Sequence, residues 1–226
     1  MTAPPGWAVE RLRGPASVFH GRALPDPIVP AVWVHEVDRP ALVLGSAEPA
    51  GHADAGRLEA SGTELVRRRS GGAAVLLVPG DVVWVDLLLP AGHRLWHDDV
   101  GRAAWWVGRA WATALGRLGT PAVVHESGLV RRPWSDRVCF AGVGPGEVSD
   151  RAGRKLVGLS QRRTRAGARF QTAVHLRWDP AALAAVLDLT DGERTALVDD
   201  LAGAVAAVGV PADVLVAALI AALPPA

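Results

Sequence analysis

The sequence has little cysteine, little charge imbalance and no long apolar run. Cys139 is the only cysteine, which excludes an intramolecular disulfide framework and suits a reducing cytoplasm. The first 15 residues lack the apolar core of a secretory signal, and the most apolar run, residues 214–223, is about half the length that spans a bilayer. The net charge is only +1, and half of the residues are hydrophobic. We therefore expect a soluble cytoplasmic protein with no membrane or nucleic-acid partner.

Lysine is equally scarce. The 24 basic side chains comprise 23 arginines and Lys155, which lies between Gly153 and Gly158. Arginine can supply charge anywhere on a surface, whereas lysine supplies a compact point charge with three rotatable donors. This scarcity predicts a chemical role for Lys155, the alternative being a surface residue without one.

A basic, glycine-rich turn is the second unusual stretch, and its residues are Arg67, Arg68, Arg69, Ser70, Gly71, Gly72 and Ala73. In a strand, Arg67 and Arg69 share one face and Arg68 points to the other. Paired glycines let a ligand approach the backbone and its N–H groups. The turn therefore suits a carboxylate or phosphate, or else it is an ordinary loop with a solvated basic face. It matches neither the P-loop nor the dinucleotide-binding pattern.

Alternating and helical patterns predict a mixed α/β fold. Strands are expected at 31–37, 41–44, 64–69, 73–78, 82–89, 121–126, 138–142, 156–163 and 169–178. Helices are expected at 51–60, 100–118, 181–187, 190–208 and 211–223. The first 30 residues read as an irregular lead-in with a short helix near 7–12. Pro79-Gly80-Asp81 predicts a β-hairpin between its flanking runs.

Two other stretches are weaker candidates for a functional site. His93 and His97 have the spacing of metal ligands on a helix, but Pro90-Ala91-Gly92 before them indicates a loop, so we expect no metal site. Trp84 shares a strand face with Val82 and Asp86 and is a candidate lining residue.

Two motifs together resemble the biotin/lipoate protein ligase superfamily, in its lipoate-ligase and octanoyltransferase branch. Residues 67–75 resemble Arg-Arg-x-Ser/Thr-Gly-Gly-Gly-Ala-Val, and residues 153–162 resemble Gly-Lys/Arg-Lys-hydrophobic-x-Gly-Ser-Ala/Ser-Gln-Arg. Cys139-Phe140, with Pro145 and Glu147, resembles the segment that precedes this lysine in many members.

The resemblance implies a mixed β-sheet flanked by helices, with a catalytic domain over 1–180 and a helical tail over 181–226 packed on it. It implies an acyl tunnel beside the glycine turn, and it gives Lys155 the role of meeting the acyl carbonyl or the phosphate of the intermediate. A fixed ammonium in a largely apolar pocket stabilises such charge better than solvent does. Besides the seven turn residues, the implied binding residues are Gly158, Ser160 and Gln161.

The family performs two reactions. A ligase uses ATP and Mg²⁺ to make lipoyl-adenylate, which a lysine of an acceptor lipoyl domain attacks. A transferase has no cofactor and moves octanoate from acyl carrier protein through a cysteine, for which Cys139 is the candidate, and Lys155 would assist its thiolate. Alternatively, Cys139 is a small buried residue. The acceptors implied are the E2 subunit of 2-oxoacid dehydrogenases and the glycine cleavage H protein. The 45 or so residues after Pro180 look too short for the accessory domain of many ligases.

The sequence also departs from the family pattern. Ala73 replaces the third glycine, Leu76-Leu77-Val78 replaces Tyr-His-Asp, and Gln171-Thr172-Ala173 replaces a His-Gly-Ser/Thr segment, with His175 displaced. A second alternative is therefore a protein that binds acyl chains or lipoyl domains without catalysis.

Overall fold

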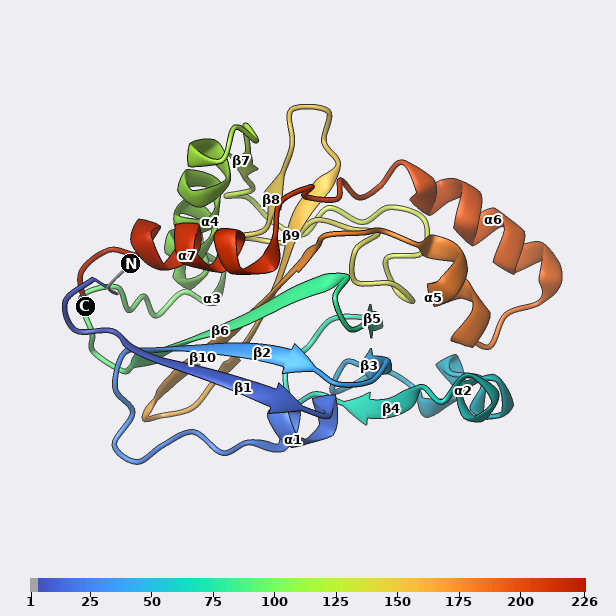
Figure 1. The fold of residues 1–226 in the computed structure, drawn as a ribbon, viewed down its shortest axis with the longest axis horizontal. Helices are drawn as coiled ribbons and strands as arrows, with labels where there is room; N and C mark the ends of the chain where they lie inside the picture. The colour runs from blue at the N-terminus through green and yellow to red at the C-terminus, as the bar shows by residue number, and fades with distance from the viewer. Residues whose placement is uncertain (1–3) are drawn as a thin grey trace.

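A seven-stranded sheet forms the centre of the molecule in the computed structural model, which describes residues 4–226 (Figure 1). Its strand order is β1-β2-β6-β10-β9-β8-β7, and every neighbouring pair is antiparallel except β1 and β2. The strands are β1 (Ala8–Gly14), β2 (Ala31–Val37), β6 (Val82–Pro90), β7 (Val123–Val124), β8 (Val148–Ser149), β9 (Lys155–Arg163) and β10 (Gly167–His175). A second sheet of order β4-β3-β5 contains β3 (Ala41–Leu44), β4 (Glu64–Arg67) and β5 (Val75–Leu77).

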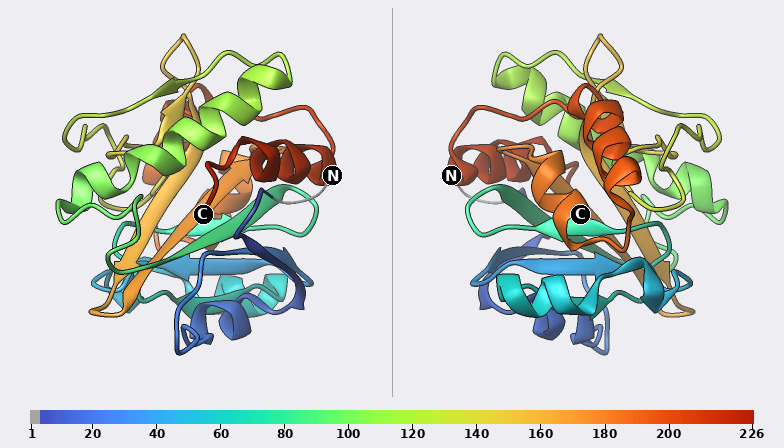
Figure 2. Two further views of the ribbon diagram at one scale, coloured as in Figure 1. Left: turned by 90° about the vertical axis from the view of Figure 1, so that its left-hand side faces the viewer. Right: turned by 90° about the vertical axis from the view of Figure 1, so that its right-hand side faces the viewer.

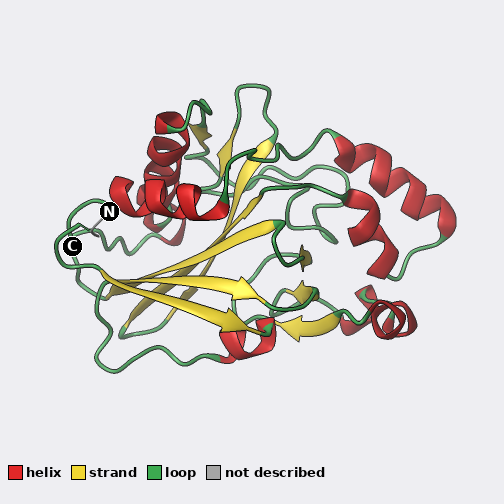
Figure 3. Cartoon of the chain, in the orientation of Figure 1, coloured by secondary structure: helices red, strands yellow, loops and turns green. Residues whose placement is uncertain are grey.

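Helices cover both faces of the large sheet (Figure 3). They are α1 (Ala16–Gly21), α2 (Ala55–Ser61), α3 (Val100–Ala103), α4 (Trp105–Arg117), α5 (Pro180–Val186), α6 (Asp191–Ala202) and α7 (Ala212–Ala222), with a 3₁₀ turn at Ala50–His52. Within residues 4–226, no helix combines the length and apolarity needed to cross a membrane.

Two hydrophobic cores lie on opposite faces of the large sheet. One packs α4 and α7 against the sheet around residues such as Leu87 and Trp111. The other joins the sheet to α1, the small sheet, α5 and α6 around residues such as Leu42 and Phe140. Figure 2 shows these layers edge-on, with α4 and α7 on one side of the strands and the small sheet on the other. This mixed sheet flanked by helices confirms the predicted fold class.

Local sequence signals explain the starts of α2, α3, α5 and α6. Asp54, Asp99 and Asp179 each accept a hydrogen bond from the backbone N–H three residues later. Thr190 and Glu193 form the predicted capping box at the start of α6. The expected helix at 100–118 is present but is divided at Ala104 into α3 and α4.

Three expectations are wrong, and a fourth is wrong in part, because the helix expected at 190–208 ends at Ala202. Residues 8–14 form edge strand β1 instead of a helix in an irregular lead-in, and its mostly exposed side chains hide the alternation of a buried strand. The runs around Pro79-Gly80-Asp81 do not form a hairpin, because β5 pairs with β3 while β6 pairs with β2 and β10. The turn instead passes the chain from one sheet to the other. Residues 138–142 form turns rather than a strand, with only one bridge, between Ala74 and Val138.

Candidate functional site

The site lies between the two sheets, where strand register places polar side chains on one face of the large sheet. In β9 and β10, Ser160 faces Gln171 and Gly158 faces Ala173. Side chains two residues apart share a face, so these four residues form a continuous surface. The glycine-rich turn between β4 and β5 covers it.

The turn depends on Gly72, whose φ is +99°. A Cβ atom there would lie 2.6 Å from Nη2 of Arg68, and a Cβ on Gly45 would lie 1.7 Å from the carbonyl oxygen of Gly72. Both positions therefore require glycine. Ala73 lies outside the positive-φ region, so the departure from a third glycine costs the backbone nothing here.

The three arginines of the turn have different surroundings. Arg68 is 4% exposed and donates to the carbonyl oxygens of Gly71 and Ala73. Arg67 is exposed and donates to the carbonyl oxygen of Gly45, and Arg69 is also exposed. Their burial follows the predicted alternation, and Arg68 is the one directed into the site.

Lys155 is 1% exposed and is bonded from two sides. Its Nζ lies 2.7 Å from Oε2 of Glu147 and donates to the carbonyl oxygen of Cys139 at 2.8 Å. The Phe140 ring lies below the ammonium, with its centroid 5.1 Å away. Gly158 leaves room for that ring, since a Cβ there would lie 2.8 Å from Phe140. The lone lysine is thus a buried, ion-paired residue and not a surface accident.

Cys139 is fixed to the glycine turn by backbone hydrogen bonds. Its N–H donates to the carbonyl oxygen of Ala74 at 2.9 Å, and the N–H of Ala74 donates to that of Arg137 at 3.1 Å. The thiol lies 3.9 Å from Nη2 of Arg68. This bridge brings Cys139, Gly72 and Lys155 into one neighbourhood, although 83 residues separate the glycine from the lysine in sequence.

Two cavities meet at Cys139, Leu159 and Ser160, which line both. The inner pocket is narrow, about 40 Å³, and its other walls are His20, Val43, Arg68, Val75, Leu77, Trp84, Phe140, Gly158, Gln171 and Ala173. The outer groove is about 750 Å³, and its lining includes Glu48, Gly71, Gly72, Ala73, Val100, Gly101, Arg131, Glu147 and Gln161. The site thus combines a narrow, mainly apolar inner pocket with a wider groove that carries charged side chains such as Glu48, Arg131 and Glu147.

A chain of side-chain hydrogen bonds crosses the floor of the inner pocket. Ser70 Oγ bonds to Ser160 Oγ at 3.0 Å and donates to Gln171 Oε1 at 2.8 Å, and the Gln171 amide contacts His20 Nδ1 at 3.3 Å. The His20 ring stacks on Trp84 with centroids 4.4 Å apart. Burial lowers the pKa of His20 to about 3, so its imidazole is neutral at physiological pH.

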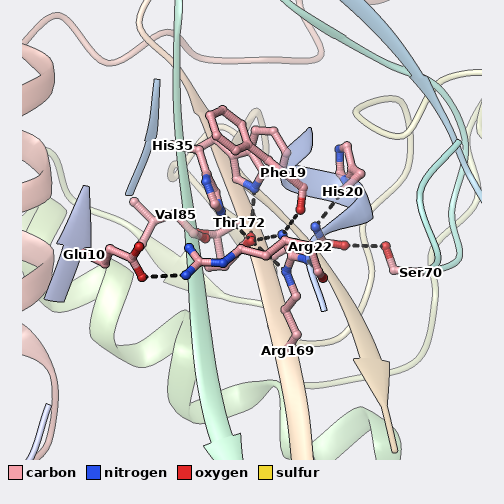
Figure 4. Close-up of polar contacts among 12 residues, drawn as sticks. Glu10, Phe19, His20, Arg22, His35, Ser70, Val85, Arg169 and Thr172 are labelled. Atoms are coloured by element: carbon pink, nitrogen blue, oxygen red, sulfur yellow. Dashed lines mark hydrogen bonds and ion pairs between the residues drawn. The ribbon is translucent and has the colours of Figure 1, made fainter. Parts of the chain in front are cut away.

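A buried ionic cluster supports this floor (Figure 4). Asp86 is fully buried and accepts from Trp84 Nε1 at 2.8 Å and Arg169 Nε at 2.7 Å, and it contacts His35 Nε2 at 2.8 Å. Arg169 also donates to the carbonyl oxygen of Phe19 in α1. Burial alone would raise the pKa of Asp86, but the charges of His35 and Arg169 bring it down to about 2. The cluster fastens α1 to the large sheet.

Most, but not all, of the predicted site residues line the cavities. Those that do are Arg68, Gly71, Gly72, Ala73, Cys139, Gly158, Ser160 and Gln161. Ser70 lines neither cavity but bonds to Ser160 and Gln171, and Lys155 lies directly behind Glu147. Arg67 and Arg69 line neither cavity. Gln161 Nε2 donates to the carbonyl oxygen of Val100 and so ties β9 to α3.

Sequence reasoning gave no role to several residues that build the site. Glu147 was visible only as part of a resemblance, and His20 lies in a stretch expected to be irregular. Asp86 and Arg169 are 83 positions apart, and only the β6–β10 pairing brings them together. A signal was available: an aspartate and an arginine inside runs that otherwise alternate as buried strands need partners there.

The chain belongs to the family of the lipoyl protein ligase A/B catalytic domain, whose model matches residues 17–210. No curated protein sequence matches the chain.

Solved structures share the fold at low sequence identity. A bipartite lipoate protein ligase from Thermoplasma acidophilum, described with its E2 lipoyl domain, superposes with a TM-score of 0.74 at 18% identity, covering 98% of this chain and 82% of that one. A T. acidophilum protein with bound lipoic acid gives 0.73 at 17%, covering 97% and 84%. A lipoate-protein ligase A bound with ATP gives 0.68 at 17%, covering 97% and 83%.

Proposed function

We propose that this protein is a lipoate–protein ligase that attaches a lipoyl or octanoyl group to a lysine of an acceptor lipoyl domain through an acyl-adenylate. The observation that carries the proposal is that the buried Lys155 ammonium bonds to the backbone of Cys139, which lies where a mainly apolar pocket opens into a wider groove. The acyl chain would occupy the inner pocket, which places its carboxyl group at the junction.

The groove suits the nucleotide. Gly71 and Gly72 present backbone close to the junction, and Arg131 lies on the groove wall. In the first step the carboxylate attacks the α-phosphorus of ATP, and pyrophosphate leaves. In the second step the acceptor amine attacks the acyl carbonyl, AMP leaves, and the amine loses a proton. Lys155 would stabilise the charge that develops on the carbonyl and phosphate oxygens. ATP with Mg²⁺ would be a co-substrate, and lipoic acid and ATP are the ligands carried by two of the similar structures.

The acceptor we propose is a lipoyl domain, either of a 2-oxoacid dehydrogenase E2 subunit or of the glycine cleavage H protein, in the cytoplasm. The bipartite ligase of T. acidophilum supports this choice, because it is described with an E2 lipoyl domain. It also makes a separate accessory subunit a reasonable addition to the assay.

The transferase is a second candidate, and the position of Cys139 favours it. Cys139 lines both cavities, and its thiol lies 3.9 Å from Nη2 of Arg68. In this reaction Cys139 Sγ would attack the thioester of an octanoylated acyl carrier protein and expel the carrier thiol. The acceptor lysine would then release Cys139.

The test is a mass measurement on an apo lipoyl domain incubated with the protein and either lipoate plus ATP and Mg²⁺ or octanoyl-carrier protein. We expect an ATP-dependent gain of one lipoyl group, reduced about a hundredfold or more by Lys155→Met because an electrostatic stabiliser is lost, and retained in Cys139→Ser. A gain from the thioester that Cys139→Ser abolishes would instead identify the transferase. No gain from either donor, with or without an accessory subunit, would contradict both and favour a binding protein without catalysis.

A further inference from the structure

Glu147 lines the site, but neither the sequence nor the proposed chemistry assigns it a role. We propose that Glu147 is a positioning residue that holds the Lys155 ammonium away from the groove until an anionic acyl intermediate takes its place as counter-ion. This inference rests on the proposed function for its substrate, but its structural part can be tested without turnover.

The geometry separates Lys155 from the groove. Glu147 lines the groove, whereas Lys155 does not, and the two side chains are 6% and 1% exposed with 2.7 Å between Nζ and Oε2. Two of the three donors of the ammonium are occupied, by Glu147 and by the carbonyl oxygen of Cys139. In this conformation the ammonium cannot reach an acyl carbonyl in the groove unless it exchanges at least one partner.

Glu147 is the fixed member of the pair. Its Oε2 accepts from the N–H of Gly144 at 2.6 Å, and its Oε1 accepts from the N–H of Leu159 at 3.0 Å. The Lys155 backbone is also fixed, because its N–H donates to Ala204 at 2.8 Å and its carbonyl oxygen accepts from Ala206 at 2.9 Å. The lysine stem, with four rotatable bonds, is therefore the part that moves.

When Lys155 leaves Glu147 for the intermediate, neither the carboxylate nor the ammonium remains as an uncompensated buried charge. Breaking a buried ion pair is costly when one charge is left alone. Here the carboxylate keeps two backbone N–H donors after the ammonium leaves, and the ammonium gains the negative oxygens of the intermediate. The pair also explains how an ammonium persists in this apolar surrounding before substrate arrives.

The single lysine makes a direct test possible. Amine-acylating reagents modify one side chain in this protein, so the mass of the peptide that contains residue 155 reports the accessibility of its amine. In the ligand-free wild-type protein, we expect acylation about a hundredfold or more slower than in the denatured chain, since reaction requires local opening. In Glu147→Gln we expect it to be at least about tenfold faster than in the wild type, because loss of one partner destabilises the remaining buried charge.

Glu48→Gln is the matched control. Glu48 is likewise buried, lines the same groove and accepts from the N–H three residues earlier, that of Gly45 at 3.0 Å, but it pairs with His52 instead of Lys155. We expect the labelling rate of residue 155 in this variant to equal that of the wild type. Glu147→Asp, which keeps the charge and shortens the reach, should give an intermediate rate and serves if Glu147→Gln does not fold.

Equal labelling rates in wild type and in folded Glu147→Gln or Glu147→Asp would overturn the proposal, as would wild-type labelling at the rate of the denatured chain. A protein with protected Lys155 but no transfer activity would refute the proposed function and leave the ion-pair result standing.

Discussion

Gly72 sets the geometry of the site at the scale of a single residue. Its positive φ turns the chain so that the carbonyl oxygen of Gly72 approaches Gly45 and the Arg68 guanidinium packs beneath the turn. The neighbouring Gly71 is in the same turn, yet a Cβ there would meet nothing within 4 Å. The steric requirement for glycine therefore holds at position 72 and not at position 71.

We expect Gly72→Ala to lower the free energy of unfolding by about 1–2 kcal/mol from the backbone conformation alone, with a further loss from the contact with Arg68. Gly71→Ala is the control and should unfold at nearly the wild-type denaturant concentration. Chemical denaturation of the two single variants measures the difference. Similar losses in the two variants would mean that the turn does not have the backbone conformation described here.

At the scale of elements, the sequence predicted those whose signals are local. The α6 capping box, the Asp179-Pro180 start of α5 and the buried strands β2, β3 and β9 were all found close to their observed bounds. The sequence did not predict the features that depend on which strands pair with one another. β1 is largely exposed, and the partners of β5 and β6 depend on which sheet each strand joins, which no local pattern encodes.

Helix α6 offers a test of such a local signal. Replacing Thr190 with alanine removes the hydrogen bond to the Glu193 N–H and should reduce stability by about 1 kcal/mol. Thr195→Ala, inside the same helix and exposed, should cost much less, because its hydroxyl bonds only to the carbonyl oxygen of Asp191 within the helix. Thermal unfolding of the two variants distinguishes a capping effect from a general loss of threonine.

At the scale of the whole molecule, the two faces of the large sheet differ in what they pack against. One packs an apolar core against α4 and α7, and the other carries the inner pocket and buried polar residues such as His20 and Asp86. The sequence pointed to Lys155 and the glycine turn because both are locally unusual. It assigned no role to His20, Asp86 and Arg169, because the partners of these residues lie far away in the chain. It assigned none to Glu147, because only the fold shows the contact between Glu147 and Lys155.

The buried polar face predicts sensitivity to moderate acid. Burial lowers the pKa of His175 to about 4 and that of His20 to about 3. Unfolded histidines bind protons near pH 6.5, whereas these two stay neutral in the folded protein, so stability falls as the pH is lowered from about 6.5 to about 4. The depressed pKa of Asp86 adds stability that is present above about pH 4 and is lost only as the pH falls through about 2.

The measurement is the free energy of unfolding as a function of pH. His175 packs between Phe140 and Trp178, and its Nε2 has no hydrogen-bond partner, so phenylalanine is a suitable replacement. His175→Phe should remove up to about 1.4 kcal/mol of the loss per pH unit in that window. The exposed His97, changed to glutamine, should leave the slope as it is. A wild-type slope in His175→Phe would show that this imidazole takes up its proton without unfolding.

The burial of the only lysine has a consequence for the protein's own chemical integrity. An enzyme that makes activated acyl groups for amines is exposed to its own product, and each accessible lysine on its surface would be a competing acceptor. Here the other 23 basic side chains are guanidinium groups, which stay protonated and are poor nucleophiles, and the one ε-amine is enclosed by Glu147 and Cys139. Under the function proposed above, the chain would resist self-acylation, and the acceptor's lysine would be the favoured destination for the acyl group.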